Sequence, residues 1–136
     1  MLMNENTSKV NIMVVEDEDL LLQAITTKME KQGINTIPCT RGEQALDYLE
    51  SMEKLPNAIW LDYYLKGSMN GLEFLQKLKA KDEWKDIPVI VVSNTASDEK
   101  VKNILALGAN KYMLKAEHRL DELVDTIQNF IDTDIS

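Results

Sequence analysis

Short apolar runs recur along this chain, and most of them stop on a charged or hydroxyl side chain. The runs are rich in β-branched residues and apolar throughout, which is typical of strands buried on both faces of a parallel sheet. The second run contains Pro38, which favours a place near an edge of the sheet. The pattern predicts five strands, at residues 10–15, 34–38, 58–62, 87–92 and 111–114.

Apolar residues at helical spacing fill the segments between these strands. Glycine and Ser97 mark several helix ends, because glycine is favoured just past a helix and serine at its N-cap. The five predicted helices are one that stops at Gly33, one over 41–52, one that carries Leu72, Leu75 and Leu78, one between Ser97 and Gly108, and one that carries Leu120 to Ile131.

Strands and helices that alternate in this way predict a doubly wound α/β fold, with five parallel strands and five helices on both faces of the sheet. The chain shows no internal repeat and no linker that would divide it. We therefore expect one domain over residues 9–132, a flexible N-terminal segment at 1–8, a C-terminal tail at 133–136 and no effector domain.

Composition narrows the possible functions. The net charge of −8 argues against binding to a phosphate backbone and suits a protein that binds a divalent cation. The single cysteine, Cys39, cannot form a disulfide within the chain, which favours a reducing compartment. No apolar run is long enough for a signal peptide or a membrane span, so a cytoplasmic protein that binds neither membrane nor nucleic acid is expected.

Charged and polar residues stand at the carboxyl ends of four predicted strands: Glu16 and Asp17, Asp62, Ser93 and Lys115. Parallel strands end at one edge of a sheet, where open α/β folds bind their ligands. Three carboxylates about 5 Å apart would repel each other by roughly 3 kcal/mol per pair at an effective dielectric constant of about 20. Lys115 can compensate one charge, and the remainder predicts a Mg²⁺ ion, which prefers carboxylate oxygens together with phosphate.

A divalent cation, a lysine and a hydroxyl group together suit a phosphoryl group, whose oxygens they neutralise. A carboxylate in such a site can act as the nucleophile that accepts this group. Asp62, in the middle of the set along the sequence, is the natural acceptor.

These segments resemble the receiver domain of two-component response regulators, the CheY-like family. No one segment is specific, but the four together in this order are, and the resemblance extends from about residue 9 to 131. It implies the flavodoxin-like strand order 2-1-3-4-5. The matching segments are VVEDE at 14–18, WLD at 60–62, PVIVVS at 88–93 and GANKYMLK at 108–115.

The resemblance also implies a role for each site residue. Glu16 and Asp17 become the acidic pair that binds Mg²⁺, and Asp62 becomes both phosphoacceptor and metal ligand. The backbone carbonyl of Tyr64 would be the fourth metal ligand that the protein provides.

Three further residues would respond to the phosphoryl group. Ser93 would bond one of its oxygens, Lys115 would pair with it, and Tyr112 would be the aromatic switch whose rotamer follows Ser93. The chain departs from the family pattern at four positions: Lys66 replaces a proline, Gly71 comes one residue late, Asn94 replaces a small residue, and Ala116 replaces the proline after the lysine.

The leading interpretation is a stand-alone response regulator, not an enzyme beyond its own phosphorylation and dephosphorylation at Asp62. A sensor histidine kinase or phosphotransfer protein would supply the phosphoryl group. A downstream protein would then bind the face formed by the fourth helix, the fifth strand and the fifth helix, with the regulator a monomer or weak dimer.

Two alternatives come from other classes of protein. A phosphatase of the haloacid-dehalogenase type also uses an aspartate nucleophile with Mg²⁺, but Tyr64 cannot serve as its general acid, and here the acidic pair precedes Asp62. A degenerate interaction module that is never phosphorylated should have lost an essential charge, and this chain has kept them all.

Overall fold

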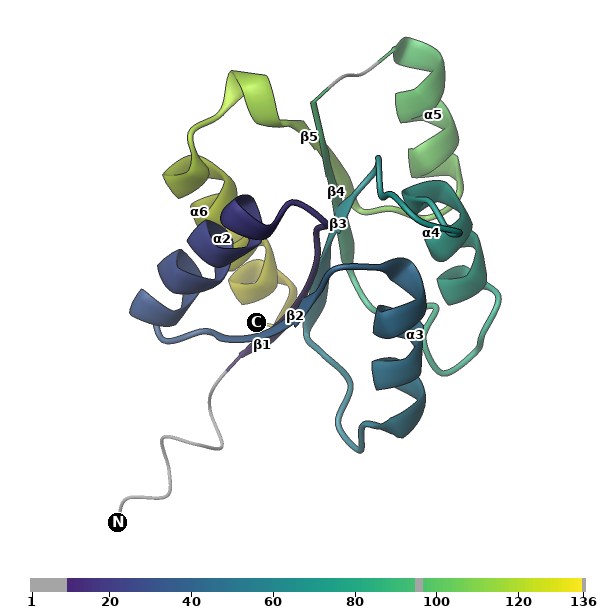
Figure 1. Ribbon diagram of the computed structural model, residues 1–136, viewed down its shortest axis with the longest axis horizontal. Helices are drawn as coiled ribbons and strands as arrows, with labels where there is room; N and C mark the ends of the chain where they lie inside the picture. Colours follow the sequence, from purple (N-terminus) through teal and green to yellow (C-terminus); the bar gives the residue numbers. More distant parts are fainter. Residues whose placement is uncertain (1–9, 95–96, 136) are drawn as a thin grey trace.

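Five parallel strands form the central sheet (Figure 1). The computed structural model describes residues 10–94 and 97–135, so the predicted N-terminal segment at 1–8 lies outside the described residues. Within these residues the strand order is β2-β1-β3-β4-β5, which confirms the predicted arrangement. The strands are β1 (Asn11–Val15), β2 (Asn35–Cys39), β3 (Ala58–Asp62), β4 (Val89–Ser93) and β5 (Lys111–Leu114).

Helices cover both faces of the sheet (Figure 1). α2 and α6 pack on one face, and α3, α4 and α5 pack on the other. In the described part of the chain the number of α-helices is the five that the sequence predicts. They are α2 (Asp19–Lys31), α3 (Gly42–Ser51), α4 (Gly71–Lys79), α5 (Asp98–Ala106) and α6 (Leu120–Ile135).

Each central strand contributes to two separate cores, because successive side chains of a strand point to opposite faces of the sheet. In β3, Ile59 and Leu61 pack with α3, α4 and α5, whereas Ala58 and Trp60 pack with α2 and α6. All five residues of β3 are buried. This explains why β3 is an uninterrupted apolar run up to Asp62 and does not alternate with polar residues.

Strands β2 and β5 form the edges of the sheet. Pro38 lies in β2, opposite Val14 of β1, so the predicted edge position of this strand is confirmed. A proline is tolerated there because an edge strand pairs on one side only.

Helix ends follow the predicted signals. Gly33 and Gly108 adopt φ angles of 83° and 112°, in the left-handed region that favours glycine just after a helix. The Ser97 side chain accepts a hydrogen bond from the backbone N–H of Lys100 and caps α5 as expected. α6 continues to Ile135, beyond the predicted domain boundary at 132.

Beyond β5 the chain turns directly into a short 3₁₀ helix, Lys115–Glu117. Every peptide bond in the described residues is trans, including the one between Lys115 and Ala116. The missing proline therefore leaves this connection in the ordinary trans form.

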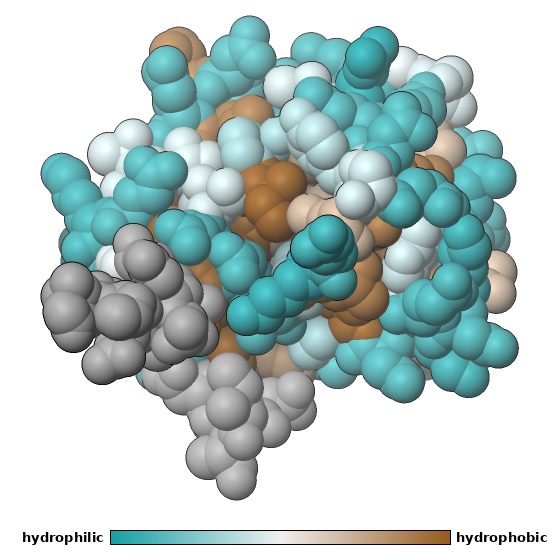
Figure 2. All heavy atoms as spheres, turned by 90° about the horizontal axis from the view of Figure 1, so that it is seen from below, coloured by the Kyte–Doolittle hydropathy of each residue, from teal (hydrophilic) through white to brown (hydrophobic). Residues whose placement is uncertain are grey.

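One face of the molecule is mainly hydrophilic (Figure 2). Seen from below, polar side chains cover most of the visible face, and hydrophobic residues gather toward its middle (Figure 2). Among the described residues, no helix combines the length and the apolar composition that crossing a membrane requires.

Candidate functional site

The predicted site residues meet at the carboxyl edge of the sheet. Asp62 and Ser93 are the last residues of β3 and β4, and Glu16 and Lys115 directly follow β1 and β5. Hydrogen bonds continue past the strand ends here, with Glu16 N–H donating to the Cys39 carbonyl over 2.9 Å. The backbone at this edge is therefore held by the same kind of hydrogen bond as the strands, and this fixes the positions of the Cα atoms from which these side chains extend.

Three carboxylates form one cluster. One oxygen each from Glu16, Asp17 and Asp62 lies within 4.8 Å of the others. Glu16 is 1% exposed and Asp62 is 5% exposed, whereas Asp17 is half-buried. Negative charge is thus concentrated where water can screen it only in part.

Lys115 is the cation of this cluster. Its Nζ lies 3.0 Å from Glu16 Oε1 and 3.5 Å from Asp62 Oδ2. Burial alone would lower the pKa of Lys115, but the charges of Asp62 and Glu16 and the hydrogen bonds to them raise it overall. The ammonium therefore stays charged beside the two carboxylates.

One ammonium does not neutralise three carboxylates. Burial first, and then the charge of Asp62, raise the pKa of Glu16 to about 7, although Lys115 opposes the shift. Two buried acids side by side need further positive charge if both are to be ionised. The donor set, consisting only of carboxylate oxygens, suits a hard divalent cation such as Mg²⁺.

The β3–α4 loop is tied to the cluster by two backbone N–H groups. The N–H of Tyr64 donates to Asp62 Oδ1 over 3.1 Å, and the N–H of Lys66 donates to Asp17 Oδ2 over 2.6 Å. Lys66 stands where the family pattern has proline, which has no N–H. This bond is therefore available to the present chain only because the proline is missing.

Gly71 packs closely against the end of β3. A Cβ atom at this position would lie 2.6 Å from the carbonyl oxygen of Asp62 and 2.7 Å from that of Tyr63. The Gly71 N–H also donates to the Tyr63 carbonyl over 3.1 Å. Only glycine allows the first turn of α4 to approach Asp62 this closely.

Ser93 and Tyr112 lie on the side of the cluster toward β5. Ser93 is fully buried, and its strand β4 runs between β3, which ends on Asp62, and β5, which leads to Lys115. Tyr112 is half-buried in β5 beside Val91 and packs against the core under α3, α4 and α5. Asn94 is exposed immediately after Ser93.

Two features near the site have no signal in the sequence. His118 is half-buried and lines a cavity of about 180 Å³ together with Trp60 and Lys115. Lys100, on α5, contacts Tyr63 and Tyr64 of the β3–α4 loop. Both arrangements depend on how loops fold back, and neither residue stands in a recognisable spacing.

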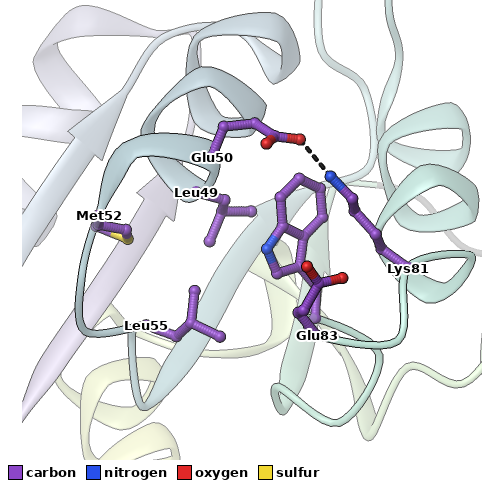
Figure 3. A pocket seen from close by; sticks show the side chains of 7 residues that line it. Leu49, Glu50, Met52, Leu55, Lys81 and Glu83 are labelled. Carbon is purple, nitrogen blue, oxygen red and sulfur yellow. Dashed lines mark hydrogen bonds and ion pairs between the residues drawn. The ribbon is translucent and has the colours of Figure 1, made fainter.

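A second pocket lies at the opposite, amino edge of the sheet (Figure 3). It has a volume of about 230 Å³ and sits between the end of α3 and the connection that follows α4. Lys81 closes it, with its Nζ 4.4 Å from the centre of the Trp84 ring and an ion pair to Glu50 (Figure 3). Glu50 and Glu83 are the acidic residues of its lining, whereas the group of three carboxylates lies at the carboxyl edge.

The sheet order and the acidic cluster define the class of protein: a flavodoxin-like α/β domain with an acidic pocket at the carboxyl edge of its strands. Residues 12–128 match the family described as "Response regulator receiver domain". The chain therefore belongs to the receiver domains of two-component response regulators.

Known relatives agree with this assignment. The chain is 31% identical over 104 residues to the phosphate regulon transcriptional regulatory protein PhoB of Rhizobium meliloti, and the match covers 76% of this chain and 44% of PhoB. It is 30% identical over 109 residues to a putative response regulator, NtrX-like, of Rickettsia conorii, covering 79% of this chain and 22% of that protein. The chain thus spans less than half the length of these relatives.

A solved structure shows the same fold. The Francisella response regulator 1452 receiver domain superimposes with a TM-score of 0.81 at 25% identity, and the alignment covers 93% of this chain and 99% of that one. The receiver domain of the Pseudomonas aeruginosa sensor histidine kinase PA1611, with magnesium in its active-site cleft, gives a TM-score of 0.78 at 23% identity, with coverages of 92% and 99%.

Proposed function

We propose that this domain accepts a phosphoryl group on Asp62 from a histidine kinase or phosphotransfer protein and signals through protein contacts. The observation that carries the proposal is the pocket in which Glu16, Asp17 and Asp62 lie together beside Lys115. Membership of the receiver-domain family speaks against the phosphatase alternative. All the charged groups that the reaction needs are present, which opposes the degenerate interaction module.

The donor set fits Mg²⁺. Glu16, Asp17, Asp62 and the backbone carbonyl of Tyr64 would hold the ion, which when bound would neutralise oxygens of the incoming phosphoryl group. The magnesium in the receiver domain of PA1611 supports this choice by analogy.

Three side chains of the chain would carry out the other parts of the phosphoryl transfer. An oxygen of the Asp62 carboxylate attacks the phosphorus, an acyl phosphate bond forms, and the bond from phosphorus to the donor's histidine nitrogen breaks. The electron pair of that bond leaves with the histidine. Lys115 Nζ, 3.5 Å from Asp62 Oδ2, is placed to pair with the new negative charge. The Ser93 hydroxyl would donate a hydrogen bond to a phosphoryl oxygen.

Phosphorylation of Asp62 would also change the surface that a downstream protein recognises. If Ser93 is drawn toward the phosphoryl group, Tyr112 on the neighbouring strand β5 gains room to turn inward. The face formed by α5, β5 and α6 would then differ between the two states, and a downstream protein would bind one of them preferentially.

Intact mass spectrometry tests the acceptor. After incubation with acetyl phosphate and Mg²⁺, wild-type protein should gain the mass of one phosphoryl group, and Asp62→Asn should gain none. A gain of mass in Asp62→Asn would place the acceptor elsewhere. No gain in wild-type protein would support the degenerate module.

Beryllofluoride with Mg²⁺ tests the switch, because it mimics a phosphoryl group on a carboxylate. We expect the amide NMR signals around Ser93 and Tyr112 to shift on its addition, and the shifts to be absent in Asp62→Asn. Shifts confined to the residues next to Asp62 would contradict a switch that reaches Tyr112.

A further inference from the structure

Lys100 of α5 reaches two consecutive tyrosines of the β3–α4 loop. Its Nζ lies 4.8 Å from the centre of the Tyr64 ring and 5.5 Å from that of Tyr63, within the range of cation–π attraction. The same ammonium donates a hydrogen bond to the Tyr64 hydroxyl. The two rings meet edge to face, with centroids 4.8 Å apart and planes at 81°. One lysine thus orients a pair of aromatic rings.

Lys100 is itself held in place. Its backbone N–H donates to the Ser97 hydroxyl over 3.2 Å, in the first turn of α5. The hydrogen bond to Tyr64 raises the pKa of Lys100 although burial opposes the shift, and Tyr63 and Tyr112 raise it further. The ammonium therefore stays charged.

The bridge from Lys100 to Tyr64 joins the first turn of α5 to the β3–α4 loop. Tyr64 follows Asp62 by two residues and donates its N–H to Asp62 Oδ1, whereas Lys100 follows the loop that leaves β4 after Ser93. Strands β3 and β4 are neighbours in the sheet. The bridge therefore links the segment that follows Asp62 to the helix that comes after Ser93.

We propose that Lys100 is a positioning residue that fixes the Tyr64 ring beside the acceptor and thereby slows hydrolysis of the phosphoryl group on Asp62. The inference rests on the proposed function. In hydrolysis a water oxygen attacks the phosphorus, the bond from phosphorus to the Asp62 oxygen breaks, and the carboxylate and inorganic phosphate are released. Tyr64 is 44% exposed, so packing alone restrains its ring weakly. With Lys100 in place the ring narrows the path of that water.

The test measures how long the phosphoryl group survives. Wild-type protein and the variants are labelled with acetyl phosphate and Mg²⁺, the donor is removed, and intact mass is followed over time. Lys100→Met keeps the length of the side chain but loses its charge, and the label should disappear about fivefold faster, which corresponds to roughly 1 kcal/mol. Lys100→Arg keeps a cation and should restore a decay within about twofold of wild type.

Two controls distinguish orientation of the Tyr64 ring from a general effect of removing a lysine from α5. Lys102→Met removes an exposed lysine from the same helix and should leave the decay unchanged. In a Tyr64→Leu background, the further change Lys100→Met should have no effect, because the ring that Lys100 orients is gone. NMR signals of the Tyr64 ring should shift in Lys100→Met before any phosphorylation.

The possible failures are distinguishable. If wild-type protein is not labelled, the proposed function fails and this inference fails with it. If wild-type protein is labelled but Lys100→Met decays at the same rate, only the role of Lys100 is wrong. An equal acceleration in Lys102→Met, or an undiminished effect of Lys100→Met in the Tyr64→Leu background, would also overturn it.

Discussion

At the scale of single residues, the folded structure disfavours the ionised form of the Glu16 side chain. It is 1% exposed and lies in the same cluster as Asp62, and its pKa is raised to about 7. In the unfolded chain a glutamate titrates near pH 4.3. The folded protein therefore binds a proton on Glu16 more readily than the unfolded chain does, and ionisation of Glu16 opposes folding.

This predicts how stability depends on pH when chelator keeps the protein free of metal. Between pH 5 and 8 the free energy of unfolding should fall by on the order of 2 kcal/mol, because Glu16 becomes charged in a pocket that lacks a cation. Mg²⁺ at pH 8 should restore the loss. Urea denaturation measures both effects. The variant Glu16→Gln should lose most of the fall, and a fall of the same size in that variant would assign the effect to other groups.

Lys66, which replaces a proline of the family pattern, adds a hydrogen bond to the site. Its N–H donates to Asp17 and so links the β3–α4 loop to the residues that follow β1. The sequence shows that the proline is missing, but not that an N–H is directed at Asp17. That bond depends on the path of a loop with no regular structure, which residue types alone do not determine.

At the scale of elements, α4 is positioned by its contact with the end of β3. Asn70 and Glu73 form a reciprocal capping box at its start. Gly71 follows, with no room for a side chain against the carbonyl groups of Asp62 and Tyr63. The position of α4 and the position of the acceptor backbone are therefore coupled.

Gly71→Ala should disturb both the position of α4 and the backbone at Asp62. The added methyl group would meet backbone atoms, which cannot move aside as a side chain can, so we expect a loss of about 2–3 kcal/mol in the free energy of unfolding. Phosphorylation by acetyl phosphate should slow as well. A matched control is Gly67→Ala, where a Cβ would meet nothing within 4 Å and only the positive φ of 93° is unfavourable. Gly71 itself does not have a positive φ, so a loss in Gly71→Ala no larger than the loss in Gly67→Ala would show that the close contact is relieved at little cost.

At the scale of the whole molecule, the polar ends of the strands could be predicted from the sequence and the loop contacts could not. Parallel strands bring their carboxyl ends to one edge whatever the loops do, so Glu16, Asp62 and Lys115 could be expected to meet. The contact between Lys100 and Tyr64 joins helix α5 to the β3–α4 loop, whose course is set by tertiary packing. The same holds for the half-buried place of His118 beside Lys115.

The place of Pro38 bears on how copies of this molecule meet in solution. β2 is an outer strand whose partner on one side is β1, and among the described residues no strand pairs with its other side. A proline offers no donor for such pairing, so it blocks growth of a continuous sheet from molecule to molecule. Pro38→Val should therefore increase self-association at high protein concentration, as measured by light scattering. An unchanged scattering profile would mean that other features of β2 already keep neighbouring molecules apart.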